Sequence, residues 1–225
     1  MCGRFALTLS SKDLREYFHL DNELPVIPRY NIAPSQNVAV IRLEDGKRIL
    51  RELRWGLIPS WAKDKKIGYR TINARAETAH ESPAFLSAFR ARRCLIPANG
   101  FFEWDKAGGS KQPYFIHLAD NQPMPFAGLW DHWQDEENTY VIESCTILTI
   151  DANKVVARLH NRMPVILEPK DFEFWLDPER QQVEQLRALL KPAAPEILGI
   201  YPVSPYVNKA THEGAQCLEP AKEES

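Results

Sequence analysis

A cysteine, Cys2, directly follows the initial methionine and precedes Gly3 and Arg4. We expect a methionine aminopeptidase to remove Met1, because these enzymes accept a small second residue. The amine and the thiol of Cys2 would then lie on adjacent carbons, where both can add to one aldehyde carbon and close a five-membered thiazolidine ring. Cys2 is therefore a candidate trap for aldehydes.

The relative reactivity of the two Cys2 groups predicts the order of this reaction. An α-amine with a pKa of about 7.8 is roughly 10% neutral at pH 7, whereas a lysine with a pKa of about 10.4 is neutral several hundred times less often. Once the amine has formed an imine, the tethered thiol reaches an effective molarity of about 10⁵ M or more. We therefore expect imine formation first and rapid ring closure second.

The elements that must hold Cys2 are predicted from apolar periodicity and turn residues. Ser10 and Asp13 match a capping box, and apolar residues at helical spacing follow up to Phe18, which predicts a first helix. Asp45-Gly46 lies between the runs 38–43 and 49–55, a pattern typical of a β-hairpin. Further strands are expected at 94–96, 101–104, 114–118, 126–130 and 140–150.

Four further helical patterns surround these strands. One begins with Ser82 as cap and Pro83 in the first turn, and the others cover residues 151–159, 171–176 and 179–190. The composite predicts an α+β fold, a single domain with a curved, barrel-like antiparallel β-sheet core and several short peripheral helices. We expect this domain to span residues 1–220 and a flexible tail to span 221–225.

Composition and charge limit the class of partner. The 225 residues carry a net charge of -2 and the pI is near 6.3, which argues against a protein coated with positive charge for indiscriminate nucleic-acid binding. Any DNA site must be a local groove. No stretch reaches the roughly 18 apolar residues of a membrane span, and the N-terminus lacks a secretory pattern. We expect a soluble cytoplasmic monomer, associated with the nucleoid when bound to DNA.

The four cysteines lie far apart, without a Cys-x-x-Cys pair. This spacing argues against a zinc or redox site, so we expect no metal and no cofactor. Cys94 and Cys145 lie in apolar, strand-like runs and are predicted to be buried free thiols. Cys2 does not fit that description.

Several motifs follow Cys2 in order along nearly the whole chain. They are Met1-Cys2-Gly3-Arg4, Tyr30-Asn31-Ile32-Ala33-Pro34, Trp55-Gly56-Leu57-Ile58-Pro59-Ser60-Trp61, Asn73-Ala74-Arg75-Ala76-Glu77-Thr78, Gly100-Phe101-Phe102-Glu103-Trp104, His160-Asn161-Arg162-Met163-Pro164-Val165-Ile166-Leu167, and Pro202-Val203-Ser204 with Val207-Asn208. Together they resemble the SOS response-associated peptidase (SRAP) family. The resemblance runs from residue 1 to about 215 and is highly specific.

The resemblance implies an abasic-site processing protein that binds single-stranded DNA in the DNA damage response. In such a protein the N-terminal cysteine forms a covalent thiazolidine crosslink with the ring-opened abasic-site aldehyde and shields the strand from cleavage. Three catalytic partners are carried over from the matching motifs: Asn73, Glu103 and His160. Whether the crosslink is reversed, or strand scission by a lyase step occurs, stays open.

The surroundings of two of these partners suit the implied roles. Residues 71–77 alternate polar and apolar, so Asn73 would share a strand face with Thr71, Arg75 and Glu77 and could orient the Cys2 amine or the sugar. Glu103 lies between two aromatic residues, so we expect partial burial, which raises the pKa of a carboxyl group toward the range of proton transfer.

His160 follows a short helical pattern and lies between Arg158 and Arg162. Nearby positive charge favours a neutral, proton-accepting imidazole, which suits a proton shuttle. A lone histidine is more often a structural hydrogen bonder, and sequence alone leaves this alternative open.

The expected DNA contacts adjoin these catalytic residues. Arg4, Arg75 and Arg162 are predicted to bind phosphates, because guanidinium groups grip phosphate oxygens in pairs. Trp61 and the loop from Asn31 to Pro34 are predicted to support an unstacked nucleotide. Trp55 and the remaining tryptophans are expected to lie in the core.

Two other functions fit part of the pattern. A cysteine peptidase or autopeptidase would use Cys2 as thiolate and His160 as base, with Glu103 or Asn73 orienting the base. A thiol with a pKa near 8.5 is only a few per cent thiolate at pH 7, so this function requires activation. A non-catalytic binder of single-stranded DNA would use the arginines and tryptophans alone.

Overall fold

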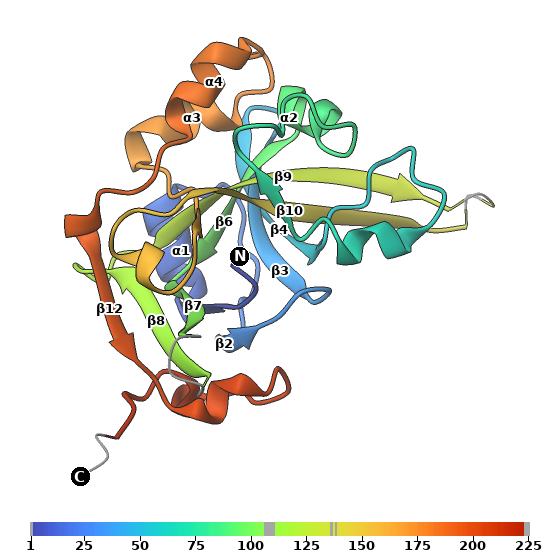
Figure 1. The fold of residues 1–225 in the computed structure, drawn as a ribbon. Coiled ribbons are helices and arrows are strands. Elements are labelled where there is room, and N and C mark those ends of the chain that lie inside the picture. Colours follow the sequence, from blue (N-terminus) through green and yellow to red (C-terminus); the bar gives the residue numbers. More distant parts are fainter. Residues whose placement is uncertain (1, 106–110, 136, 138, 223–225) are drawn as a thin grey trace.

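The computed structural model describes residues 2–105, 111–135, 137 and 139–222, and it combines two β-sheets with short peripheral helices (Figure 1). Five strands form a closed barrel, because β9 and β10, at the two ends of the ladder, also pair with each other. In ladder order the strands are β10 (Val141–Asp151), β4 (Lys47–Trp55), β3 (Asn37–Glu44), β6 (Arg93–Ala98) and β9 (Met124–Gln134). The predicted α+β class with a barrel-like core is confirmed.

The hairpin between β3 and β4 forms as predicted. Asp45 and Gly46 both have positive φ angles, 48° and 76°, which is the backbone of a tight turn that matches the twist of the flanking strands. The eight paired positions run from Glu44 with Lys47 to Asn37 with Arg54. The turn residues therefore fix the register between β3 and β4, two adjacent strands of the barrel.

Strand β10 is shared by four neighbours. One of its edges pairs in parallel first with β4, at Ser144 and Cys145, and then with β5 (Asn73–Arg75), at residues 147–149. The other edge pairs antiparallel with β9 and then with β11 (Arg162–Pro164). The expectation of a wholly antiparallel core is thus corrected at these two parallel contacts, which join segments distant in sequence.

The second sheet is antiparallel throughout and contains the N-terminal strand. Its order is β12 (Leu198–Pro202), β8 (Gln112–Leu118), β7 (Gly100–Asp105), β1 (Phe5–Leu7) and β2 (Arg29–Ile32). The ring of Phe5 lies edge-on to Trp55 at 5.2 Å and to Phe126 at 5.9 Å, both of the barrel. Burying such a ring contributes about 1.5–3 kcal/mol. This contact fixes the N-terminus between the two sheets.

The helices follow the sequence only in part. Helix α1 (Ser11–Phe18) begins after Ser10, which forms the predicted capping box with Asp13. Helix α2 (Leu86–Ala91) begins later than predicted, because the Ser82 carbonyl accepts from the Phe85 and Leu86 amides and closes a turn first.

Downstream, the helix predicted over residues 151–159 is wrong. Asp151 still belongs to β10 and pairs with Arg162 of β11, so the segment between them is a short connection. It holds only the 3₁₀ turn η2 (Val156–Arg158), and the amides of Val155 and Val156 donate to the Asn153 side chain. The other two patterns give the 3₁₀ turn η3 and two helices shorter than predicted: η3 (Pro169–Asp171), α3 (Phe172–Leu176) and α4 (Val183–Leu189).

The core contains most of the cysteines and tryptophans predicted for it, whereas Trp104 and Trp130 are half-buried. Cys94, Cys145 and Trp55 are fully buried, as predicted. At the end of the chain, the Ala221 amide donates to the Pro202 carbonyl at 2.9 Å, and residues 223–225 of the predicted tail lie outside the described residues. Among the helices of the described ranges, none has the length and apolar character needed to cross a membrane.

Candidate active site

The strand pairing of β1 brings Cys2 beside β7. Phe5 pairs with Phe101, and the Phe102 amide donates to the Arg4 carbonyl at 2.9 Å, which continues the ladder toward the N-terminus. Cys2 is fully buried. The residue with candidate nucleophilic groups therefore lies inside the protein, next to the strand that carries Glu103.

Asn73 contacts Cys2 directly from the barrel side. Its Nδ2 atom donates to the Cys2 carbonyl at 2.8 Å, so the first residue of β5 holds the N-terminal backbone. Its Oδ1 atom is buried and has no hydrogen-bond partner among the described residues. An unmet buried acceptor costs about 1–3 kcal/mol, so this position favours an added donor.

The strand around Asn73 is shorter than the alternation predicted. Thr71 is buried, and its hydroxyl donates to the carbonyls of Leu57 and Ile67. The predicted four-residue polar face is therefore wrong at Thr71. Asn73 and Glu77 are half-buried, and Arg75 is exposed.

Glu103 and burial together determine the protonation of the Cys2 thiol. Glu103 is only 5% exposed, so it is more deeply buried than predicted. Burial raises the pKa of the Cys2 thiol well above its ordinary value, and the negative charge of Glu103 raises it further. The thiol is therefore protonated at neutral pH, with a carboxylate close to it.

His160 is oriented by the backbone that follows it. The Arg162 amide donates to His160 Nδ1 at 3.0 Å, and the His160 amide donates to the Val156 carbonyl of η2. Because Nδ1 accepts a hydrogen bond, the proton of the neutral ring lies on Nε2. The local fold thus favours the neutral form that the sequence suggested, and the proton-shuttle role stays a prediction.

The Arg162 guanidinium is occupied by protein acceptors. It forms a two-point contact with Glu77, with both distances 2.7 Å, and its other terminal N–H groups donate to Asp151 at 2.7 Å and to the Thr149 carbonyl. The Glu77 hydrogen bonds raise the pKa of Arg162, and in turn Arg162 lowers the pKa of Glu77. A phosphate could bind Arg162 only by displacing one of these carboxylates. The contact of Arg162 with a DNA phosphate therefore stays a prediction.

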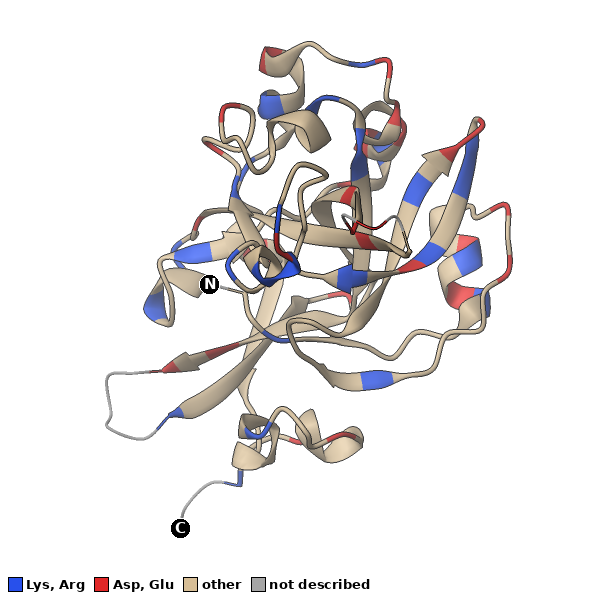
Figure 2. Ribbon diagram, turned by 90° about the vertical axis from the view of Figure 1, so that its right-hand side faces the viewer, with Lys and Arg blue, Asp and Glu red and all other residues tan. Residues whose placement is uncertain are grey.

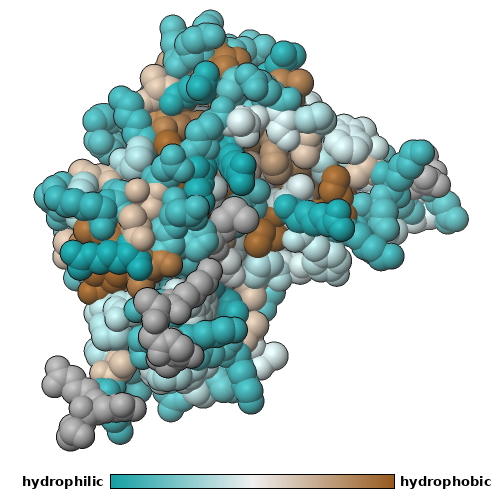
Figure 3. All heavy atoms as spheres, in the orientation of Figure 1, coloured by the Kyte–Doolittle hydropathy of each residue, from teal (hydrophilic) through white to brown (hydrophobic). Residues whose placement is uncertain are grey.

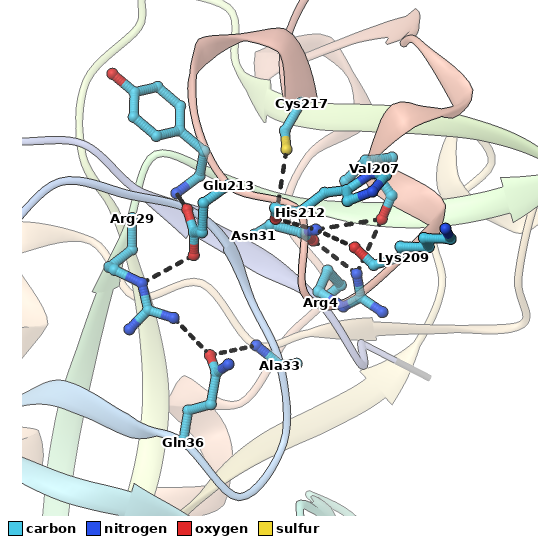
Figure 4. Close-up of polar contacts among 11 residues, drawn as sticks. Arg4, Arg29, Asn31, Ala33, Gln36, Val207, Lys209, His212, Glu213 and Cys217 are labelled. Carbon is cyan, nitrogen blue, oxygen red and sulfur yellow. Dashed lines mark hydrogen bonds and ion pairs between the residues drawn. The ribbon is translucent and has the colours of Figure 1, made fainter.

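Arg4 is held by Asn31, a residue that was predicted only as the start of a nucleotide-supporting loop. Its Nη1 atom donates to Asn31 Oδ1 at 2.6 Å and to the Val207 carbonyl at 3.0 Å (Figure 4). Asn31 is fully buried, and its Nδ2 atom donates to the carbonyls of Lys209 and His212. The Tyr30–Pro34 motif was the signal that could have found this clamp. Burial lowers the pKa of Arg4.

The loop that contains Pro34 is held from two sides. Gln36 Oε1 accepts from the Ala33 amide and from Arg29 Nη2, and Arg29 Nε contacts Glu213 at 2.8 Å (Figure 4). Pro34 itself is half-buried. The structure thus connects this predicted DNA-contact loop to the C-terminal segment.

Trp61 projects from the loop between β4 and β5. Its side chain is 58% exposed, and its Nε1 atom donates to the Pro83 carbonyl at 3.2 Å. Behind it, Asp131 accepts from the Ser60 amide, and Trp133 Nε1 donates to the Ala62 carbonyl at 2.6 Å. Two buried β9 residues therefore fix the backbone on both sides of Trp61.

The surface around these residues is mixed in charge. Figure 2 shows basic and acidic positions interspersed along the ribbon. The face in Figure 3 is mostly hydrophilic, and hydrophobic residues come to the surface at the left over β8 and β12 and just right of the middle. In the described part of the chain, no group of three or more His, Cys, Asp or Glu residues could hold a metal ion.

Comparison with known families and proteins gives a consistent result. The family described as SOS response associated peptidase (SRAP) matches residues 1–210. The chain is 40% identical over 223 residues to the abasic site processing protein YoqW of Bacillus subtilis, covering 97% of this chain and 99% of that protein. It is 30% identical over 263 residues to the abasic site processing protein HMCES of Gallus gallus, covering 98% and 78%.

A solved structure has the same fold. A crystal structure of a protein from Bacteroides thetaiotaomicron superposes with a TM-score of 0.87 at 26% sequence identity, covering 98% of this chain and 100% of that one. The similarity therefore extends over both sheets, including the N-terminal strand.

Proposed function

From the membership of this chain in the SOS response-associated peptidase family, we propose that it processes abasic sites in single-stranded DNA by covalent capture through Cys2. Met1 must first be removed, so that Cys2 carries a free α-amine beside its thiol. The protein acts as a monomer and needs no metal or cofactor for this reaction. Its product is a thiazolidine that joins the N-terminus to the ring-opened deoxyribose.

The reaction balances without an external reagent. The neutral amine adds to the C1′ aldehyde, and the resulting hydroxyl group takes up a proton and leaves as water, which gives an imine. The thiol sulfur then bonds to the same carbon, and the thiol proton passes to the nitrogen. Aldehyde and aminothiol together lose one molecule of water.

Glu103 is the proposed proton carrier for both steps. Its carboxylate receives a proton from the adding amine and delivers it to the departing hydroxyl group. It then assists transfer of the thiol proton, and the buried position of Glu103 beside Cys2 supports this role. A thiol that stays protonated until the imine forms also leaves the amine as the first nucleophile.

Asn73 is the proposed positioning residue for the amine. Its Nδ2 atom already holds the Cys2 carbonyl, and its Oδ1 atom offers an unused acceptor. The new α-amine lies on the same residue as that carbonyl, so it is the nearest donor that Met1 removal would create. His160, with its proton on Nε2, is proposed to serve the sugar hydroxyl groups, and Arg4, Arg75 and Arg162 the flanking phosphates.

One observation carries this proposal. The carbonyl of Cys2 is bound by Asn73 and its thiol is affected by the charge of Glu103, two residues that come from different sheets. A peptidase function is supported less well, because a thiolate nucleophile requires a lowered thiol pKa and the pKa of Cys2 is raised.

Intact-mass spectrometry tests the proposal directly. Purified protein is measured before and after incubation with single-stranded DNA that contains one abasic site. We expect a chain that lacks Met1, and then an adduct whose mass is the sum of both partners less one water. Retention of Met1 in adduct-forming material would rule out the thiazolidine.

Two variants serve as controls for the same measurement. Cys2→Ala retains the amine but cannot close the ring, so a stable adduct should be lost. Cys94→Ala removes a buried thiol far along the sequence and should leave the adduct intact. A stable adduct formed equally by Cys2→Ala would contradict the proposal.

A further inference from the structure

Residues 56–72 form an excursion from the barrel that we call the arm loop. The Gly56 amide donates to the Cys145 carbonyl of β10 at 2.8 Å, and the chain returns to the same edge of β10 where Asn73 pairs with Ile147. Trp55 Nε1 also donates to the Ile72 carbonyl at 2.8 Å, which ties the two ends together. The arm loop therefore leads straight into the residue that binds Cys2.

The backbone of the arm loop is fixed by close internal contacts. Gly56 has a φ of +124°, and a Cβ atom placed there would lie 2.4 Å from the Gly68 carbonyl oxygen. Asp64 accepts from the Lys66 amide at 2.8 Å and begins the 3₁₀ turn η1 (Lys65–Tyr69). The Thr71 hydroxyl bonds on the inner side close the turn. The side chain of Tyr69, the last residue of η1, therefore projects from a backbone that these contacts hold in place.

Tyr69 combines high exposure with a guanidinium partner. Its side chain is 64% exposed, and Arg54 Cζ lies 5.8 Å from its ring centroid. Arg54 Nη1 donates to the carbonyl of Ser35, a residue with a φ of 72° that non-glycine residues seldom adopt. Isolated exposed aromatic residues are common on protein surfaces. The Tyr69 ring differs from such an isolated residue, because Arg54 connects it to the loop that contains Pro34 and Ser35.

The charge of the arm loop differs from the mixed surface elsewhere. Lys63, Lys65, Lys66 and Arg70 are exposed, and Asp64 is the single acidic residue among them. The end of the loop that carries Tyr69 therefore presents an aromatic face within positive potential. This combination suits a segment of single-stranded nucleic acid, whose bases stack and whose phosphates are negative.

We propose that Tyr69 and Arg54 form a stacking shelf for one nucleobase next to the abasic position. The assignment rests on the proposed function, since it concerns how the same strand is held. The Tyr69 ring covers the face of the base, and Arg54 stays against the ring and fixes its angle. An abasic position has no base to stack. The stacking energy of the shelf therefore comes from the base of the neighbouring nucleotide.

Binding measurements with missing bases test the shelf. In the Cys2→Ala chain, which cannot trap the DNA, affinity is measured for a single-stranded oligonucleotide with one abasic analogue and normal neighbours. Tyr69→Ala should weaken this affinity about 5- to 150-fold, the range of base–aromatic stacking. The same comparison is then repeated with oligonucleotides that also lack the base on the 5′ or on the 3′ side.

The shelf predicts that the effect of Tyr69→Ala disappears with one of these two oligonucleotides, because the stacking partner is already gone. Tyr69→Phe should retain the affinity of the parent chain. Ile197→Ala is the control, because the Ile197 side chain is also exposed but belongs to η4 (Pro195–Ile197), outside the arm loop. It should leave the affinity unchanged.

Two results would overturn the shelf. One is an unchanged affinity of Tyr69→Ala, and the other is an equal loss with all three oligonucleotides. Adduct formation by the chain with Cys2 is measured separately at saturating DNA. Absence of the adduct would contradict the proposed function alone. A normal adduct, together with an effect of Tyr69→Ala that is the same for all three oligonucleotides, would contradict the shelf alone.

Discussion

The reactive corner, formed by Cys2, Asn73 and Glu103, differs in construction from the arm loop. In the corner, side chains converge from two sheets on a fully buried residue, and burial alters the proton affinity of the thiol. In the arm loop, close backbone contacts fix the chain, and the side chains of Trp61 and Tyr69 are exposed. Chemistry requires a dry environment, whereas recognition requires rings that are accessible and already ordered.

Because of this difference, substitutions in the two regions should affect different measurable properties. A substitution in the reactive corner should alter the rate of adduct formation and leave reversible DNA binding nearly intact. A substitution in the arm loop should do the opposite. The following variants test this division, beginning with the largest expected effect.

Glu103→Gln removes the charge of the reactive corner and retains its shape. We expect adduct formation at pH 7 to slow about 10²- to 10⁴-fold, the usual contribution of a positioned acid or base. The pKa of the Cys2 thiol should fall, because the Glu103 charge raises it. Single-turnover rates report the first effect, and thiol alkylation against pH reports the second. An unchanged rate would remove Glu103 from the mechanism.

Gly56→Ala should damage the arm loop instead. A methyl group there meets the Gly68 carbonyl in a backbone conformation that alanine disfavours, so we expect a loss of about 1–3 kcal/mol in the free energy of unfolding. Urea denaturation measures this loss, and reversible binding of single-stranded DNA should weaken with it.

Gly46→Ala provides the control for that variant. Gly46 also has a positive φ, but nothing lies within 4 Å of its Cβ position and it belongs to the β3–β4 turn. Its substitution should cost stability through backbone strain alone and leave DNA affinity unchanged. Equal effects of both variants on binding would break the comparison between the two regions.

Asn73→Ala probes the contact that holds Cys2 from the barrel. Loss of the hydrogen bond to the Cys2 carbonyl should cost about 0.5–1.5 kcal/mol, which appears as an adduct rate lower by about 2- to 12-fold. Reversible affinity, measured in the Cys2→Ala background, should not change. A loss of affinity without a loss of rate would instead assign Asn73 to DNA binding.

Glu77→Gln tests the smallest effect, at the border of the reactive corner. Arg162 lowers the pKa of Glu77, so the ion pair contributes stability above the unfolded pKa of about 4.3 and loses it as pH falls through the folded value. Because Glu77 is 40% exposed, the contribution is at most about 1 kcal/mol. Urea denaturation between neutral pH and about pH 3 should show a flatter acid limb for the variant. An identical limb would mean that the pair is energetically neutral.

Local signals predicted much of the fold. The Asp45-Gly46 turn and the Ser10 capping box act within a few residues, so their consequences could be predicted from the sequence. The helix over 151–159 failed because Asp151 of β10 pairs with Arg162 of β11, so the segment between them is a loop with only a short 3₁₀ turn. The parallel pairing of β10 joins segments about 75–90 residues apart, and no local pattern encodes it.

In the candidate site, too, features that depend on local sequence were predicted and those that depend on long-range contacts were not. Motifs identified Cys2, Asn73 and Glu103, and the aromatic neighbours of Glu103 predicted its burial. They did not predict that Arg162 would be held by Glu77, which lies 85 residues away. Asn31 was noticed as part of a motif but not as the anchor of Arg4, because that role depends on carbonyl groups near the other end of the chain.

The depth of Cys2 has a consequence for the protein before it ever meets damaged DNA. The thiolate form of cysteine attacks peroxides and disulfides, so a thiol kept protonated and out of solvent reacts slowly with them. Before Met1 is removed, the Cys2 thiol is thereby kept in its reduced state. The packing that buries Cys2 therefore also protects its thiol from oxidation.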